Sequence, residues 1–347
     1  MAKTAFIDPA AVDAWDLWFR WREGTRLRDL TIDTTWDRVA RAVARAENGE
    51  AATWAQRFAD AFSKWQLLPD ERLLREAGTG APTMPATQAA PSGANLNATA
   101  FLRQSRGAAV RFDHEEFIRV CTLAVRFLDD ALLAATRSDS SLQIGLFGMA
   151  DALAALGMGY AGEGACRQAQ AIARSFAEGC LRGDAILARE RGANVADGKR
   201  WGTRVRVRAR GLDSELLADV RRYGVRHARL TAIVPHPRLA LFANNVADGL
   251  DPAVQASPQT RGEASLHWRD PVLHRGDTLL AQTAQLELRA AVQPWIDRAI
   301  ETPLLALRSP NNDERAQCVA HARKLGLKPP RWRLADAANP SALAPVM

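Results

Sequence analysis

The side chains best suited to chemistry, the cysteines and histidines, are few and widely spaced. The four cysteines include no C-x-x-C pair, and the six histidines include no H-x-H or H-x₃-H pair. Metal sites need such spacings because several ligands must converge on one ion. The chain also lacks a P-loop, a G-x-S-x-G and a G-x-G-x-x-G motif. These absences predict buried cytosolic thiols, no metal site and no standard catalytic motif.

Two weaker signals have structural explanations. Asp129 and Asp130 form a carboxylate pair, but adjacent residues of a helix point in different directions, so the pair is a poor general acid and base. Gly145 and Gly148 are a weak nucleotide-binding signal. They are more typical of a helix start that packs closely on a neighbour.

An alternating arginine segment is the clearest electrostatic feature. Between residues 197 and 229 there are ten Lys or Arg and four Asp or Glu, a net charge of +6 out of +7 for the chain. A period of two predicts a strand with one basic face, formed by Arg204, Arg206, Arg208 and Arg210. Such a face suits the phosphates of a nucleotide or nucleic acid. Without interleaved aromatic residues or a binding motif, it is more typical of a solvated edge strand whose charges oppose aggregation.

Apolar residues at helical spacing predict a mainly helical chain with few strands. One predicted helix has Asp33 or Thr34 as its N-cap, another starts near Phe112, and a strand is expected at Leu230–Val234. The other expected helices cover residues 9–22, 51–65, 70–77, 162–192, 214–223, 279–300 and 312–325. No apolar run reaches 18 residues and no apolar signal core follows the N-terminus, which predicts a cytoplasmic protein without membrane contact.

A Pro/Ala-rich stretch divides the chain. Residues 79–94 contain three prolines within ten residues and no helical or strand period, so they are predicted to be a linker. The predicted organisation is an N-terminal helical domain at 1–78, the linker at 79–94, a second part at 95–335 and a disordered tail at 336–347.

Stretches on both sides of the linker resemble, in collinear order, the large subunits of ribonucleotide reductases, in the style of the adenosylcobalamin-dependent type. Before the linker they are TTWDRVARAVARAE and LLPDERLLREAGTG. After it they are NLNATAFL, QIGLFGMADALAALGMGY, TAIVPHPRLALFANNVADGLDP, AAVQPWIDRAIETPLLAL and ARKLGLKPPRWR. The resemblance covers about nine-tenths of the chain.

The resemblance implies a ten-stranded α/β barrel in which a thiyl radical, on a cysteine within an N-x-C-x-E loop, abstracts a hydrogen from a ribose. Two further cysteines supply electrons. This chain has no N-x-C-x-E, and Ala94 stands where one redox cysteine is expected. The family's phosphate-binding turn corresponds to Pro235, His236, Pro237 and Arg238, which lack its hydroxyls. Pro237 also removes a backbone donor, while Arg238 keeps a positive charge.

The resemblance and its gaps predict a shortened, non-catalytic relative with a binding or regulatory role and with no catalytic residue. The linker would replace the catalytic segment, leaving an α+β remnant of the barrel. The N-terminal helices or a homodimer would cover its open edge. Expected partners are a nucleotide or a full-length reductase subunit, and adenosylcobalamin would bind only if a partner restored the site. The alternatives are one half of a split reductase, or a nucleic-acid-binding module built on Arg204–Arg210.

Overall fold

The computed structural model describes residues 4–80, 93–104, 107–135, 141–193, 211–252, 278–306 and 309–334. Three predicted features lie outside the described residues: the arginine strand at 204–210, the tail at 336–347 and most of the linker at 79–94. The described part combines many helices with short strands. It therefore confirms the predicted α+β class.

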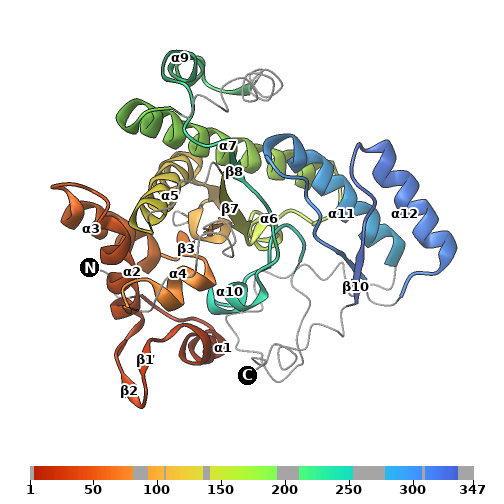
Figure 1. Ribbon diagram of the computed structural model, residues 1–347. Coiled ribbons are helices and arrows are strands. Elements are labelled where there is room, and N and C mark those ends of the chain that lie inside the picture. The colour runs from red at the N-terminus through yellow and green to blue at the C-terminus, as the bar shows by residue number, and fades with distance from the viewer. Residues whose placement is uncertain are drawn as a thin grey trace.

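A four-stranded sheet forms the centre of the molecule (Figure 1). Its order is β3 (Leu67–Pro69), β4 (Gly93–Asn97), β7 (Ser141–Phe147) and β8 (Arg229–Thr231). Strands β4, β7 and β8 are parallel, whereas β3 is antiparallel to β4. The strand expected at 230–234 is thus present, and it starts one residue earlier.

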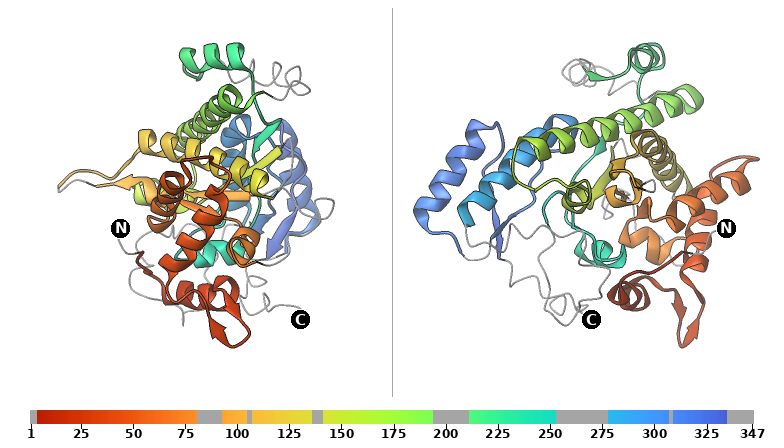
Figure 2. Two further views of the ribbon diagram at one scale, coloured as in Figure 1. Left: turned by 60° about the vertical axis from the view of Figure 1, so that its left-hand side comes forward. Right: turned by 180° about the vertical axis from the view of Figure 1, so that it is seen from behind.

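Two long helices, α5 (His114–Ala134) and α7 (Glu163–Arg191), pack closely against each other. Their approach depends on Gly179, because a Cβ there would lie 2.6 Å from the Cβ of Cys121 and 2.7 Å from the carbonyl oxygen of Ile118. Helix α7 ends one residue before Gly192, as the sequence predicts. Viewed from behind, α7 runs along one side of the whole sheet (Figure 2).

The N-terminal elements lie on one side of the sheet and the C-terminal helices on the other. The first helix is shorter than expected, because a π-helical turn at Trp15–Phe19 ends it. Thr31 caps the second helix in a capping box with Thr34, so the expected cap at Asp33 or Thr34 is wrong. The N-terminal elements are α1 (Pro9–Ala14), β1 (Arg22–Glu23), β2 (Arg26–Leu27), α2 (Ile32–Ala44), α3 (Ala51–Ser63) and α4 (Glu71–Glu76).

The remaining elements follow the predictions with small changes at their ends. Helices α9 (Ser214–Tyr223) and α12 (Asn312–Lys324) begin where expected, whereas α11 (Thr278–Val292) stops early, before Pro294. The others are η2 (Ala98–Phe101), β5 (Leu102–Arg103), β6 (Arg111–Phe112), α6 (Met149–Ala155), α10 (Pro237–Phe242), η7 (Gln293–Trp295), β9 (Leu304–Ala306) and β10 (Trp332–Leu334). Strands β9 and β10 pair in parallel, away from the central sheet.

One hydrophobic core extends across the predicted boundary at residue 78. Phe58 and Phe62 of α3 contact Phe127 of α5 edge to face, with ring centroids 5.2 and 5.3 Å apart. Strand β3, from the N-terminal part, also pairs with β4 from the second part. The boundary stays a prediction, but both sides share one core and one sheet. Among the described helices, none is long and apolar enough to cross a membrane.

The free edge of β8 is covered within the chain. The carboxylate of Asp297 accepts hydrogen bonds from the backbone N–H groups of Leu230 (2.7 Å) and Thr231 (3.1 Å). The N–H of Arg298 donates to the carbonyl oxygen of Thr231 at 3.2 Å. An exposed strand edge invites pairing with another chain. This cover satisfies β8 without a second subunit, although a homodimer through another surface remains a prediction.

Gly148, which precedes α6, has a left-handed backbone with φ of 69°, and a Cβ there would lie 3.0 Å from Cγ2 of Thr99. Gly148→Ala is therefore expected to lower the free energy of unfolding by about 1–3 kcal/mol, measured by urea denaturation. Gly157→Ala is the matched control, because Gly157 also has a positive φ (75°) but no atom within 4 Å of an added Cβ. Equal losses in both variants would contradict close packing at Gly148.

Candidate functional site

Ala94, the expected position of a redox cysteine, lies in the interior of the sheet. It is fully buried on β4, where its register partners are Pro69 of β3 and Ile144 of β7. Alanine brings neither a thiol nor any polar group to this position. The redox-cysteine position predicted from the resemblance thus lies on a central strand and is occupied by a buried alanine.

The turn at residues 235–238 connects the end of β8 to the start of α10. It offers few donors for a phosphate, because Pro235 and Pro237 have no backbone N–H. The N–H of His236 already donates to Oδ1 of Asp248 at 2.8 Å. Burial lowers the pKa of His236, which favours the neutral imidazole. A carboxylate thus holds the donor that an anion would use.

The charges around this turn also disfavour a phosphate. The guanidinium of Arg238 lies 3.9 Å from the carboxylate of Glu71 and over the ring of Trp18, at 5.4 Å from its centroid. Burial, helped by nearby Asp251 and Glu71, raises the pKa of Asp248 to about 6. Arg238 is therefore engaged with neighbouring side chains in a partly acidic environment.

All four cysteines lie on helices and not on the strands. Cys121 is on α5, Cys166 and Cys180 are on α7, and Cys318 is on α12. Burial raises the pKa of the Cys166, Cys180 and Cys318 thiols, which makes them poor sources of thiolate. Among the residues that the structure describes, no cluster of three or more His, Cys, Asp or Glu side chains could hold a metal ion.

Comparison with known proteins agrees with this arrangement of strands. A sequence model of the ribonucleotide reductase barrel domain matches residues 92–267, which is 176 of the 347 residues. The chain belongs to the ribonucleotide reductase barrel-domain family. The match begins at the end of the predicted linker and includes β4, β7 and β8. No curated protein matches the chain.

A pocket of about 450 Å³ lies near the carboxyl ends of the parallel barrel-domain strands, where α/β folds commonly bind ligands. Its polar lining follows those ends: Asn97 closes β4, Asp151 lies on α6 after β7, and Asn244 and Asn245 follow α10. The N-terminal segment at Ile7 and Asp8 completes one wall. Neither Ala94 nor the turn at 235–238 lines it.

Backbone strain is concentrated at this pocket. Trp65, Asn244 and Asn245 have φ values of 56°, 65° and 58°, and they are the non-glycine residues with positive φ in the described chain. All three line the pocket. Such strain is unfavourable by about 1–3 kcal/mol per residue and often marks functional sites. The sequence did not predict this site. Its one local signal is the pair Asn244-Asn245 after α10, because asparagine tolerates a left-handed backbone.

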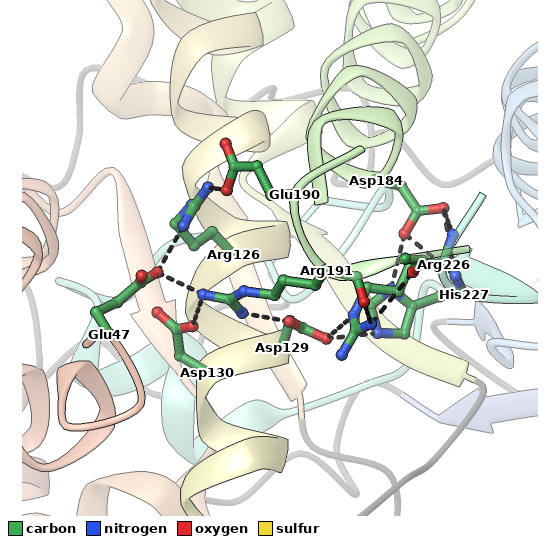
Figure 3. A network of polar contacts seen from close by, with 10 residues as sticks. Glu47, Arg126, Asp129, Asp130, Asp184, Glu190, Arg191, Arg226 and His227 are labelled. Carbon is green, nitrogen blue, oxygen red and sulfur yellow. Dashed lines mark hydrogen bonds and ion pairs between the residues drawn. The ribbon is translucent and has the colours of Figure 1, made fainter. Parts of the chain in front are cut away.

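A second polar feature, missed by the sequence analysis, joins the N-terminal part to the barrel domain (Figure 3). It is a network of ion pairs between α5, the end of α7, the segment before β8 and the chain after α2. Its members are Glu47, Arg126, Asp129, Asp130, Asp184, Glu190, Arg191, Arg226 and His227.

Arg191 is at the centre of the network. Its guanidinium contacts Glu47 at 2.6 Å and Asp130 at 2.7 Å, and it also pairs with Asp129. The two adjacent aspartates therefore meet different atoms of one arginine and do not form an acid–base dyad. Burial raises the pKa of Asp130 to about 7, and neighbouring Glu47 adds to the rise while Arg191 opposes it.

His227 occupies the other end of the network, between two buried aspartates. Its Nδ1 lies 2.7 Å from Oδ1 of Asp184, and its Nε2 lies 3.3 Å from Oδ1 of Asp129. Burial alone would lower the pKa of His227, but the two carboxylates outweigh it and raise the pKa to about 9. Burial works against the charge of Asp129 too, yet bonds from His227 and Arg226 hold its pKa well below the usual range.

The network contains one more carboxyl group than cationic side chains, which adds to the effect of burial on the pKa of Asp130. Five carboxyl groups face three arginines and one histidine, so one carboxylate is in excess even when His227 is charged. Protonation of Asp130 removes that excess. The network is thus a structural connection between elements that are far apart in the sequence.

Proposed function

We propose that this chain is a non-catalytic ribonucleotide reductase relative that acts by binding. One observation carries the proposal: the chain's four cysteines all lie on helices, while the strand position expected for a redox cysteine is Ala94. Radical reduction of a ribose needs a thiyl cysteine beside the substrate and a thiol pair that supplies two electrons. Cysteines on α5, α7 and α12 do not provide that arrangement.

The turn at 235–238 supports the same proposal. A catalytic relative must hold the phosphate of its substrate, but here the backbone N–H of His236 is already bonded to Asp248. Arg238 lies against Glu71 and Trp18. A nucleotide would have to displace these contacts before its phosphate could bind at this turn.

The residues present do not fit the chemistry of adenosylcobalamin. That cofactor supplies a radical, which a cysteine beside the substrate must receive. Here all four cysteines lie on helices. Burial also raises the pKa of the thiols on α7 and α12. We therefore derive no step through the cofactor. Binding of adenosylcobalamin would need a partner chain that brings the missing segment.

A reductase assay tests the proposal directly. The purified chain, supplied with adenosylcobalamin, a dithiol and each of the ribonucleoside di- and triphosphates, is expected to form no deoxyribonucleotide above a protein-free blank. Ala94→Cys is expected to remain inactive, because it restores one electron-donating thiol and not the radical site. Deoxyribonucleotide formation by the unmodified chain, measured by chromatography, would overturn the non-catalytic role.

A further inference from the structure

We propose that the pocket between Trp65, Asn97 and Asn244 binds a small organic carboxylate with an apolar body. The inference rests on the binding role proposed above and names its ligand class. Three properties of the described residues lead to it. They are the amide donors and cations of the pocket lining, the strained backbone, and the N-terminal segment that forms one wall.

The amide groups of the pocket are oriented to donate. Oδ1 of Asn97 accepts hydrogen bonds from the N–H and the hydroxyl of Thr99, at 3.2 and 2.7 Å. Oδ1 of Asn244 accepts from the N–H of Ile7 at 2.8 Å. Because both oxygens are occupied, each amide offers a ligand its NH₂ group. The pocket therefore recognises a group that accepts hydrogen bonds.

Two cations at the rim favour an anionic acceptor. Lys64 is exposed and lines the pocket, and no ion pair holds it within the described ranges. Arg103 also lines the pocket, and its Nε lies 3.3 Å from Asp113, so part of its charge is compensated. A carboxylate that meets Lys64 gains a charge-assisted hydrogen bond.

The two carboxylates of the lining are committed to other partners. Asp8 is 5% exposed and accepts from the N–H of Ala10 and from Nδ2 of Asn245. Asp151 is 7% exposed and accepts from the N–H of Ala247 at 2.6 Å. The donors that these carboxylates accept from offset part of their negative charge and so limit their repulsion of an anion. The remaining wall is largely apolar, with Ile7, Ala100, Leu102, Val110, Ala243 and Val246.

The strain at Trp65 places an aromatic ring in this wall. Trp65 follows α3 at the position where a helix usually has glycine. Its N–H donates to the carbonyl oxygen of Phe62, and the N–H of Gln66 donates to that of Ala61. Its indole donates to the carbonyl of Ala5 at 3.0 Å and packs on Phe6 with ring centroids 5.5 Å apart. Glycine would relax the backbone but remove the ring. The ring also packs on Trp36 and Phe242, so it presents a rigid apolar part of the lining to a ligand.

Binding is tested with phenylacetate, with its neutral isostere phenylacetamide and with phenethylamine. Isothermal titration and the melting temperature report affinity, and quenching of tryptophan fluorescence reports contact with the wall. Phenylacetate is expected to bind about tenfold more tightly than phenylacetamide. Equal affinity of the two, tighter binding of the amine, or no binding of any probe at millimolar concentration would overturn the proposal.

Three variants locate the site. Lys64→Gln is expected to remove the roughly tenfold preference for the carboxylate. Asn244→Gly, which tolerates the left-handed backbone, is expected to weaken phenylacetate by a few-fold. Arg41→Gln on α2, whose arginine side chain is 75% exposed and does not line the pocket, is the matched control and should change neither. Unchanged preference in Lys64→Gln would show that the carboxylate is not bound beside Lys64 and would refute binding in this pocket, whereas deoxyribonucleotide formation would refute only the non-catalytic role.

Discussion

Replacing Arg191 with methionine is expected to lower the free energy of unfolding by about 3–5 kcal/mol, because the variant leaves buried charges without their partner. Asp129 and Asp130 are 2% and 0% exposed, and Arg191 contacts both of them as well as Glu47. Methionine has a similar length but no charge. Urea denaturation followed by far-ultraviolet circular dichroism measures the loss.

An exposed ion pair gives the matched control for Arg191. Arg167 pairs with Glu163 one turn away on the same helix, with side chains 66% and 84% exposed. Arg167→Met is expected to change stability by less than about 1 kcal/mol, because solvent screens exposed pairs. A loss below about 1 kcal/mol in Arg191→Met as well would show that the network contributes little to the fold.

Stability is expected to fall by several kcal/mol between about pH 4 and about pH 9, because two groups of the network bind protons more tightly in the folded chain. His227 has a folded pKa of about 9 against 6.5, so its stabilisation is present below pH 6.5 and is lost as the pH rises to 9. This shift corresponds to a stabilisation on the order of 3 kcal/mol. Asp130 has a folded pKa of about 7 against 3.8 in the unfolded chain. Its contribution to stability is therefore present below pH 3.8 and is lost as the pH rises to about 7.

Acid acts on the network in the opposite direction. The lowered pKa of Asp129 gives stability that is present above about pH 4 and is lost as the pH falls further. Maximum stability is therefore expected near about pH 4. Urea midpoints measured from about pH 3 to about pH 9 report the profile. His227→Gln should flatten its upper part and Asp130→Asn its middle part, whereas Arg167→Met, which removes an exposed ion pair, should leave its shape unchanged. A flat profile in the unmodified chain would contradict these proton affinities.

Local sequence signals located most helices but not all of their ends. Apolar spacing and capping residues predicted α9 and α12, since the Asn311 cap and the basic last turn of α12 are local features. The helix expected at 9–22 was too long, because a periodic apolar face does not reveal a π-turn at Trp15–Phe19. The N-cap of α2 was misplaced because Thr31, Asp33 and Thr34 are all good caps and only the fold chooses among them.

The candidate pocket could not be predicted, because its residues come from five separate parts of the chain. Residues 7–8, 64–65, 97–104 with 110, 151 and 243–246 become neighbours only when the sheet and its helices have assembled. Asp129 and Asp130 were rightly rejected as a dyad on helix geometry. Their role in the ion-pair network was invisible, because Arg191 and His227 are distant in sequence.

The sequence alone pointed to the ribonucleotide reductase family, which the barrel-domain match confirms, and it predicted that Ala94 replaces a redox cysteine. It also determined the α+β class, because apolar period and caps act within a few residues. The tertiary structure decided which groups meet: the carboxylate of Asp248 on the turn at 235–238, Asp297 on the edge of β8, and the amides of Asn97 and Asn244 in one pocket. Such contacts join residues far apart along the chain, and only packing brings them within hydrogen-bonding distance.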